Sequence, residues 1–207
     1  MTWGRIPWAP TSCRIALCIA IAADASAQAV ERPELKSGDR WSFVVWYTQP
    51  ATIPNREWIV ETVAADRITG TENGDPLVLT PDLGVLESPR NIESNPKWLR
   101  FPLAVGDRWS FEDNYYVKYK NSRGLVRAEV AVVAYEKVRV VAGEFDAFKL
   151  EASAQMGGIS GIGSTIDAEA KHTYWYAPEA RAIVKWEARN PYLGPSTTEL
   201  VERGRKP

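Results

Sequence analysis

The sequence has little of what most catalytic and metal sites are built from. Its 207 residues include 2 cysteines and 1 histidine. A zinc site needs several imidazole or thiolate ligands, and His172 is not accompanied by a Gly-x-Ser-x-Gly nucleophile motif. Cys13 and Cys18 both fall in the N-terminal segment, so the rest of the chain has no disulfide and no thiol nucleophile. We therefore predict no catalytic residue, metal ligand or cofactor, and the sequence favours a protein that is not an enzyme.

The sequence also lacks an excess of charge and a long apolar run. Its 25 Lys and Arg residues nearly balance 26 Asp and Glu residues, for a formal net charge of −1. A nucleic-acid-binding surface needs a basic field, so we exclude nucleic acid as a partner. A transmembrane helix needs about 20 consecutive apolar residues. We expect no transmembrane segment in the mature chain.

The one short apolar run lies near the N-terminus and has the features of an export signal. Arg5 and Arg14 precede Ile15–Ala23, which is too short to span a bilayer as a helix, and Ala27-Gln28-Ala29 fits a cleavage site. We predict a cleaved signal peptide at residues 1–29 and a single all-β domain at 30–207.

An export signal without disulfides is typical of a bacterial envelope protein rather than a small disulfide-stapled module. Cys18 raises the alternative of a lipid anchor, but Leu17 is a poor residue to precede a lipidated cysteine. We expect a periplasmic or extracellular protein that is soluble after signal cleavage.

What the sequence does contain is a repeated motif. Leu35–Phe43 and Leu103–Phe111 share the leucine and an unbroken Gly-Asp-Arg-Trp-Ser-Phe, 68 positions apart. Glycine tolerates positive φ and aspartate can bond its own backbone, so each copy predicts a turn. The following Trp-Ser-Phe alternates large and small residues, which indicates a strand with one buried face. We assign these structural roles to Gly38, Asp39, Trp41, Gly106, Asp107 and Trp109.

The remaining pattern predicts strands joined by short turns. Asn73-Gly74 is a strong hairpin signal, and Leu125–Val141 is long enough to require a bend or a bulge. Glu87–Pro102 contains three prolines and is predicted as a surface loop, with a lid or binding loop as the alternative. We expect an all-β fold: a single antiparallel, strongly curved sheet or half-open barrel of about ten strands.

Tryptophan is the most informative excess. Large rings on strands usually fill a core, but a concave sheet lined with them could also bind an apolar ligand or stack on sugars. Trp41 and Trp46 must face opposite sides of their strand, because their separation is odd. The candidate ligand-binding residues are Trp46, Trp58, Trp175 and Trp186.

Three segments in order carry a resemblance to a known family: Phe101–Trp109, Val141–Leu150 and Tyr174–Pro178, the last followed by Val184-Lys185. They resemble the PLxVGxxW, AGxFxAxK and WYAP…VK motifs of uncharacterised secreted bacterial proteins, catalogued as a domain of unknown function. The resemblance implies a curved, antiparallel all-β domain, distantly similar to the half-barrels of envelope lipoprotein carriers. It brings no catalytic residues. It implies structural roles for Gly143, Phe145, Trp175 and Pro178.

These observations favour a non-enzymatic envelope protein whose curved sheet binds a lipid, another apolar small molecule or an envelope protein partner. A carbohydrate-binding or glycan-active protein remains an alternative, using exposed tryptophans beside a carboxylate pair. A structural assembly subunit would need an unpaired edge strand. An outer-membrane barrel of about eight strands is a further alternative, against which stand the basic C-terminal residues 203–207 and strands charged on both faces.

Overall fold

The computed structural model describes residues 29–47, 56–190 and 194–205. The predicted signal peptide, residues 1–29, therefore lies outside the described residues except for Ala29, and so do both cysteines. In the described ranges no helix is long and apolar enough to cross a membrane. The described chain forms one short 3-10 helix, η1 (Lys118–Lys120), and these strands: β1 (Asp39–Tyr47), β2 (Arg56–Val63), β3 (Ile68–Glu72), β4 (Asp75–Leu79), β5 (Val85–Glu87), β6 (Asn91–Glu93), β7 (Arg108–Val117), β8 (Ser122–Val140), β9 (Gly143–Ile159), β10 (Thr165–Ala177), β11 (Ala182–Asn190) and β12 (Gly194–Arg205).

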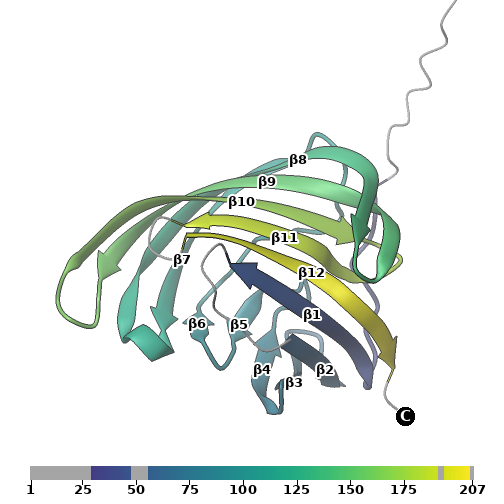
Figure 1. Cartoon of the computed structure of the whole chain (residues 1–207), viewed down its shortest axis with the longest axis horizontal. Coiled ribbons are helices and arrows are strands. Elements are labelled where there is room, and N and C mark those ends of the chain that lie inside the picture. The colour runs from purple at the N-terminus through teal and green to yellow at the C-terminus, as the bar shows by residue number, and fades with distance from the viewer. Residues whose placement is uncertain (1–28, 48–55, 191–193, 206–207) are drawn as a thin grey trace, which may run out of the picture.

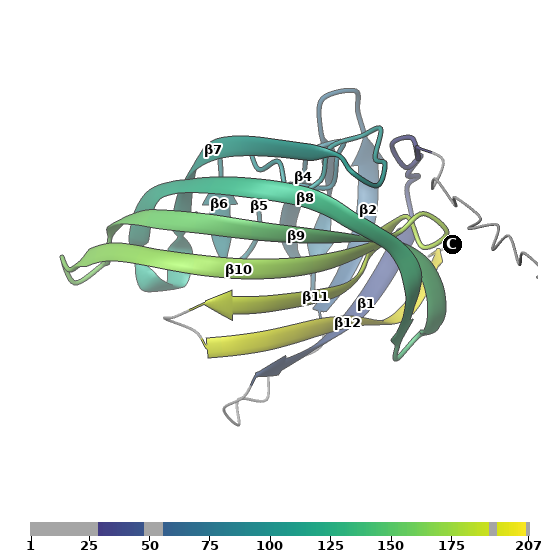
Figure 2. The ribbon, with the colours of Figure 1, turned by 90° about the horizontal axis from the view of Figure 1, so that it is seen from above.

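The strands form a closed antiparallel barrel (Figures 1 and 2). Each strand pairs with its neighbours in the chain, and β12 returns to pair with β1. This pairing runs from Asp39 opposite Arg205 to Tyr47 opposite Ser196. The all-β antiparallel prediction is confirmed. The prediction of a half-open sheet of about ten strands is wrong, because the described residues form a closed ring of twelve.

The missed strands are short and lie where the sequence indicates turns or loops. β5 and β6 have three residues each; β6 lies within Glu87–Pro102, which was predicted as a loop, and β5 ends at Glu87. They complete the wall because β6 pairs with β5 on one side and with β7 on the other. The hairpin at Asn73-Gly74 is confirmed by φ angles of 54° and 89°, which fit a tight two-residue turn.

The long strands β7–β10 run side by side along one wall, and β9 and β10 extend beyond β11 and β12 (Figure 2). β8 has 19 residues and its register shifts between Val132 and Ala134, so the expected bulge is confirmed. Buried residues such as Val126 and Ala128 alternate with exposed, charged ones such as Arg127 and Glu129. This alternation places the apolar face inside the barrel and a charged face outside.

The buried side chains form two clusters. Trp41 and Phe43, from the first copy of the repeat, belong to one cluster with Leu200. Phe111, from the second copy, belongs to the other with Phe148 and residues of the long strands. The repeat is thus used at two separate places in the barrel.

Candidate functional site

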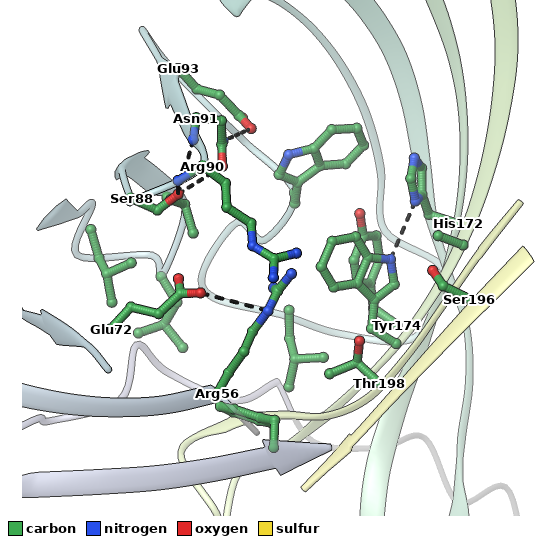
Figure 3. A pocket seen from close by; sticks show the side chains of 18 of the residues that line it. Arg56, Glu72, Ser88, Arg90, Asn91, Glu93, His172, Tyr174, Ser196 and Thr198 are labelled. Carbon is green, nitrogen blue, oxygen red and sulfur yellow. Dashed lines mark hydrogen bonds and ion pairs between the residues drawn. The ribbon is translucent and has the colours of Figure 1, made fainter. Parts of the chain in front are cut away.

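The barrel encloses a cavity of about 800 Å³ (Figure 3). Each of the twelve strands contributes at least one residue to its wall, and most of the lining side chains are apolar or aromatic. A volume of this size falls within the range of small-molecule sites, roughly 300–1,000 Å³. The cavity is therefore the candidate functional site.

One side of the cavity is a group of ring side chains, Trp98, His172, Tyr174 and Trp186, which we call the aromatic wall. The rings of Tyr174 and Trp186 are stacked with centroids 5.6 Å apart. Trp98 lies 5.3 Å from His172 and 6.0 Å from Tyr174, measured between ring centroids. These stacked, tilted and edge-on contacts hold the rings together as one largely apolar surface.

His172 is neutral within this wall. Burial lowers the pKa of its imidazole to about 4. The indole N–H of Trp186 lies 3.3 Å from Nδ1 of His172, which accepts its hydrogen bond and is therefore unprotonated. His172 thus contributes a neutral ring and an acceptor for Trp186 rather than a charge.

A second part of the wall is cationic. The guanidinium groups of Arg56 and Arg90 point toward each other inside the cavity (Figure 3). Arg56 forms an ion pair with Glu72, with 3.6 Å between Nε and Oε1, and its side chain is 16% exposed. Burial lowers the pKa of Arg56, the Glu72 charge raises it and the Arg90 charge lowers it again. An arginine nevertheless stays protonated at neutral pH.

The turn between β5 and β6 presents Arg90. The Ser88 hydroxyl oxygen accepts hydrogen bonds from the backbone N–H groups of Arg90 and Asn91, each at 3.2 Å. The nearby carboxylate of Glu87 is engaged by Lys118, 2.9 Å away. In the part of the chain that the structure describes, the Arg90 guanidinium has no ion pair or hydrogen bond.

Glu93 is the other acidic residue of the cavity wall. Burial and the Asp113 charge raise the pKa of its carboxyl group to about 7, whereas the neighbouring Trp98 and Asn91 side chains lower it. Asn91 donates to Glu93 Oε1 at 2.8 Å. The other oxygen, Oε2, is buried without a hydrogen-bond partner among the described residues. A carboxyl group in this state can be protonated near neutral pH and act as a donor.

The four predicted ligand-binding tryptophans do not come together. Trp58 and Trp186 line the cavity. Trp46 and Trp175 are not among the described residues that line the cavity. Trp46 is 46% exposed, and Trp175 donates its indole N–H to Glu136 Oε1 at 2.9 Å. The roles of all four in binding stay predictions.

The predicted structural residues occupy turns and buried contacts. Gly38, Gly106 and Gly143 have φ angles of 85°, 98° and 129°. Trp41 donates its indole N–H to the Ala180 carbonyl at 2.9 Å, and Trp109 donates to the Lys97 carbonyl at 2.7 Å. Phe145 is buried under the Arg203 guanidinium, 5.4 Å from the ring centroid. The Pro178 carbonyl accepts a hydrogen bond from the Arg181 backbone.

Sequence reasoning missed the charged residues of the cavity and Trp98. Arg90, Glu93 and Trp98 all lie within Glu87–Pro102, the segment for which a binding loop was the alternative interpretation. The sequence signal that could have identified this segment as part of a binding site is its combination of three prolines with a tryptophan and several charged residues. Within the described ranges, no group of three or more His, Cys, Asp or Glu side chains could hold a metal ion.

The comparisons with known proteins place the fold but not the activity. No family model and no curated protein matches the sequence. A protein of Bacteroides fragilis described as exported, with a YmcC-like fold, aligns with a TM-score of 0.51 and 16% identity over 86% of this chain and 100% of that chain. A protein of Parabacteroides distasonis described as a lipoprotein aligns with a TM-score of 0.53 and 14% identity over 85% and 99%.

A third similar structure is the hypothetical lipoprotein YmcC of Escherichia coli K12, with a TM-score of 0.51 and 8% identity over 83% of this chain and 87% of that chain. At these identities the likeness is one of fold. The chain therefore has an all-β antiparallel fold that is similar to the folds of proteins described as exported or as lipoproteins.

Proposed function

We propose that this protein is a non-enzymatic binding protein of the bacterial envelope that holds an apolar or amphiphilic small molecule inside its barrel. The observation that carries the proposal is the cavity of about 800 Å³ whose wall draws on every strand. The predicted signal peptide, with residues 30–207 as the mature domain, and the likeness to exported proteins and lipoproteins support an envelope location.

The aromatic and aliphatic lining provides the driving force for binding. Each 100 Å² of apolar ligand surface removed from water contributes roughly 2.5 kcal/mol. The lost freedom of the ligand opposes this gain by several kcal/mol. An amphiphile of about twelve carbons would therefore bind with an affinity in roughly the micromolar range. Trp58 and Trp186 would contact it, because both line the cavity.

The closed ring gives less support to the alternative of an assembly subunit. Such a subunit would offer an unpaired strand edge to its neighbour. In the ring order of the described strands, each strand has a partner on both sides. A ligand inside the barrel uses the cavity that the ring creates, so we favour it over edge-to-edge assembly.

The first test is native mass spectrometry of the mature protein purified from its own envelope, followed by lipid extraction. A co-purifying apolar molecule at a fixed stoichiometry would support the proposal. The same protein, stripped of lipid, is then titrated with N-phenyl-1-naphthylamine, an uncharged probe that fluoresces in apolar surroundings. Saturable binding of one probe per chain is expected.

Matched variants connect the probe signal to the cavity. Ala188 lines the cavity, so Ala188→Phe fills it and should weaken probe binding at least about tenfold. Ile162→Ala removes a side chain that is 91% exposed and outside the cavity lining, and it should leave binding unchanged. Circular dichroism checks that both variants fold. A clean apo mass together with no saturable probe binding would overturn the proposal, as would equal binding by folded Ala188→Phe and wild type.

A further inference from the structure

We infer that the ligand of the cavity is an amphiphile with a single anionic head group, whose oxygen atoms are held by the guanidinium groups of Arg56 and Arg90 while its apolar tail lies against the aromatic wall. This inference rests on the proposed function and names the ligand class. It is carried by the placement of two arginines that face each other in a cavity whose lining is mostly apolar and aromatic (Figure 3).

The charges of the cavity wall leave one cation without a carboxylate. Three arginines line the cavity, and one of them, Arg181, is bound to Asp39 through two contacts of 2.9 and 3.0 Å. Glu72 pairs with Arg56. Glu93 is held by Asn91 instead of by an arginine. Arg90 is thus the remaining cation, and a ligand with one negative charge would balance it.

Two buried N–H donors of the cavity wall also lack a hydrogen bond to any described residue, although one of them, Arg56 Nε, lies 3.6 Å from Glu72 Oε1 in the ion pair. Arg56 Nε and Trp58 Nε1 are buried without hydrogen-bond partners in the described residues. The two residues lie two positions apart on β2, so their side chains share one face of the strand. Arg90 faces Arg56 from the turn before β6 (Figure 3). Together Arg56 and Arg90 offer several N–H donors to one part of the cavity, and Trp58 adds a further donor to its wall.

The chemistry of these donors selects for an oxyanion. A guanidinium group is a planar fork that matches a carboxylate or a phosphate through paired hydrogen bonds. Hydrogen bonds to a charged acceptor are roughly twice as strong as neutral ones. An uncharged alcohol or ester could accept from these donors but would leave the Arg90 charge unbalanced.

The cationic end lies toward solvent, and the aromatic wall supplies the apolar surface beyond it. Tyr119 lines the cavity, is 62% exposed and lies within electrostatic range of Arg56 and Arg90. Tyr174 lies across the cavity from the arginines (Figure 3), and its ring is stacked on that of Trp186. One ligand that spans both regions would have a charged end near water and an apolar chain inside.

The test compares probes of equal chain length in calorimetric titrations of the delipidated protein. Dodecanoate and dodecyl phosphate carry the anion, dodecanol is uncharged and dodecyltrimethylammonium is cationic. Both anionic probes are expected to bind at least about tenfold more tightly than dodecanol and the cation. Preference for dodecanoate would assign a carboxylate and preference for dodecyl phosphate a phosphate, and either result supports the inference.

Arg90→Gln is the decisive variant, because no ion pair in the described residues is broken by it. It should weaken dodecanoate binding about tenfold and leave N-phenyl-1-naphthylamine binding unchanged. The double variant Arg56→Gln with Glu72→Gln removes the second guanidinium without stranding its carboxylate, and it should show the same selective loss. Raising the salt concentration should weaken the anionic probes alone.

The outcomes separate the inference from the function on which it rests. If the uncharged probes bind but dodecanoate has no advantage, or if Arg90→Gln affects all probes equally, the anionic class is wrong and the cavity still binds apolar molecules. If neither charged nor uncharged probes bind, the proposed function itself fails.

Discussion

Asp39 and Asp107 occupy equivalent positions in the two copies of the repeated motif, and each accepts a hydrogen bond at 2.8 Å from the backbone N–H three residues earlier. They differ in their surroundings. Asp107 is exposed, whereas Asp39 is 1% exposed and binds the guanidinium groups of Arg181 and Arg205. The same turn is therefore used once at the surface and once as a buried charge centre.

This difference predicts unequal effects of one substitution. Burial raises the pKa of Asp39, but the Lys36 N–H and the Arg205 and Arg181 guanidiniums outweigh it, so the net pKa is lowered. Asp39→Asn leaves both guanidinium groups without their carboxylate and should reduce the free energy of unfolding by about 2–3 kcal/mol. This loss is smaller than for a fully buried ion pair, because both arginines are partly exposed to solvent.

Asp107→Asn is the matched control, because an asparagine side-chain oxygen can accept the same backbone hydrogen bond. Its cost should stay within about 0.5 kcal/mol. Urea unfolding of both variants at neutral pH measures the difference. Equal losses would show that the buried ion pairs of Asp39 make no net contribution to stability.

Glu93 and His172 predict opposing effects of pH on stability. The pKa of Glu93 is raised from 4.5 to about 7, so its contribution is complete below about pH 4.5 and is lost as the pH rises to about 7. The pKa of His172 is lowered from 6.5 to about 4, so its contribution is complete above about pH 6.5 and is lost as the pH falls to about 4. The two slopes offset each other between about pH 4.5 and 6.5.

Replacing one of the two residues should reveal the pH dependence of the free energy of unfolding that the other residue causes. In Glu93→Gln the free energy of unfolding should rise with pH across this window, and in His172→Asn it should fall. Each change amounts to at most about 3 kcal/mol over the full titration. Denaturant unfolding at five pH values measures the profiles. Parallel profiles in wild type and both variants would contradict the assigned pKa shifts.

Gly157 and Gly158 predict a sharp contrast between adjacent positions of β9. A Cβ atom at Gly158 would lie 2.3 Å from the Arg123 carbonyl oxygen and 2.7 Å from the Gly124 Cα. A Cβ atom at Gly157 would meet no atom within 4 Å. Gly158→Ala should therefore lower the free energy of unfolding by roughly 2–4 kcal/mol, because two backbones must separate.

Gly157→Ala provides the control in the same strand. With space available, the alanine should be neutral or stabilise the protein by up to about 1 kcal/mol, since it restricts the unfolded chain. Thermal unfolding of the two variants decides the matter. A similar loss of melting temperature in both would mean that the close approach at Gly158 is relieved by small shifts of β8.

The positions of individual strands could be predicted from the sequence, but the closure of the sheet into a barrel could not. The strand that the sequence predicts from Trp41-Ser42-Phe43 lies within β1 (Asp39–Tyr47). Trp41 is buried and Trp46 exposed, as their odd separation predicts. The pairing of β1 with β12 joins residues from opposite ends of the described chain, and nothing in either strand alone encodes its partner.

The aromatic part of the candidate site was partly within reach of the sequence, and the charged part was not. Trp58 and Trp186, which line the cavity, were candidates because large rings on the strands of a concave sheet can contact an apolar ligand. Arg56 gave no such signal, because a charged residue on a strand usually faces water. Its inward direction is set by the register of the closed barrel, which depends on pairing between strands that local patterns do not describe.

The pairing of β1 with β12 also sets an order of events. Every other pairing of the ring joins strands that are neighbours in the chain, so these hairpins can form before the last strand is available. The interior becomes an enclosed space when the final strand reaches the first. Non-local contacts generally form later than local ones, so we expect closure to follow the hairpins, and until then the future cavity is an open trough.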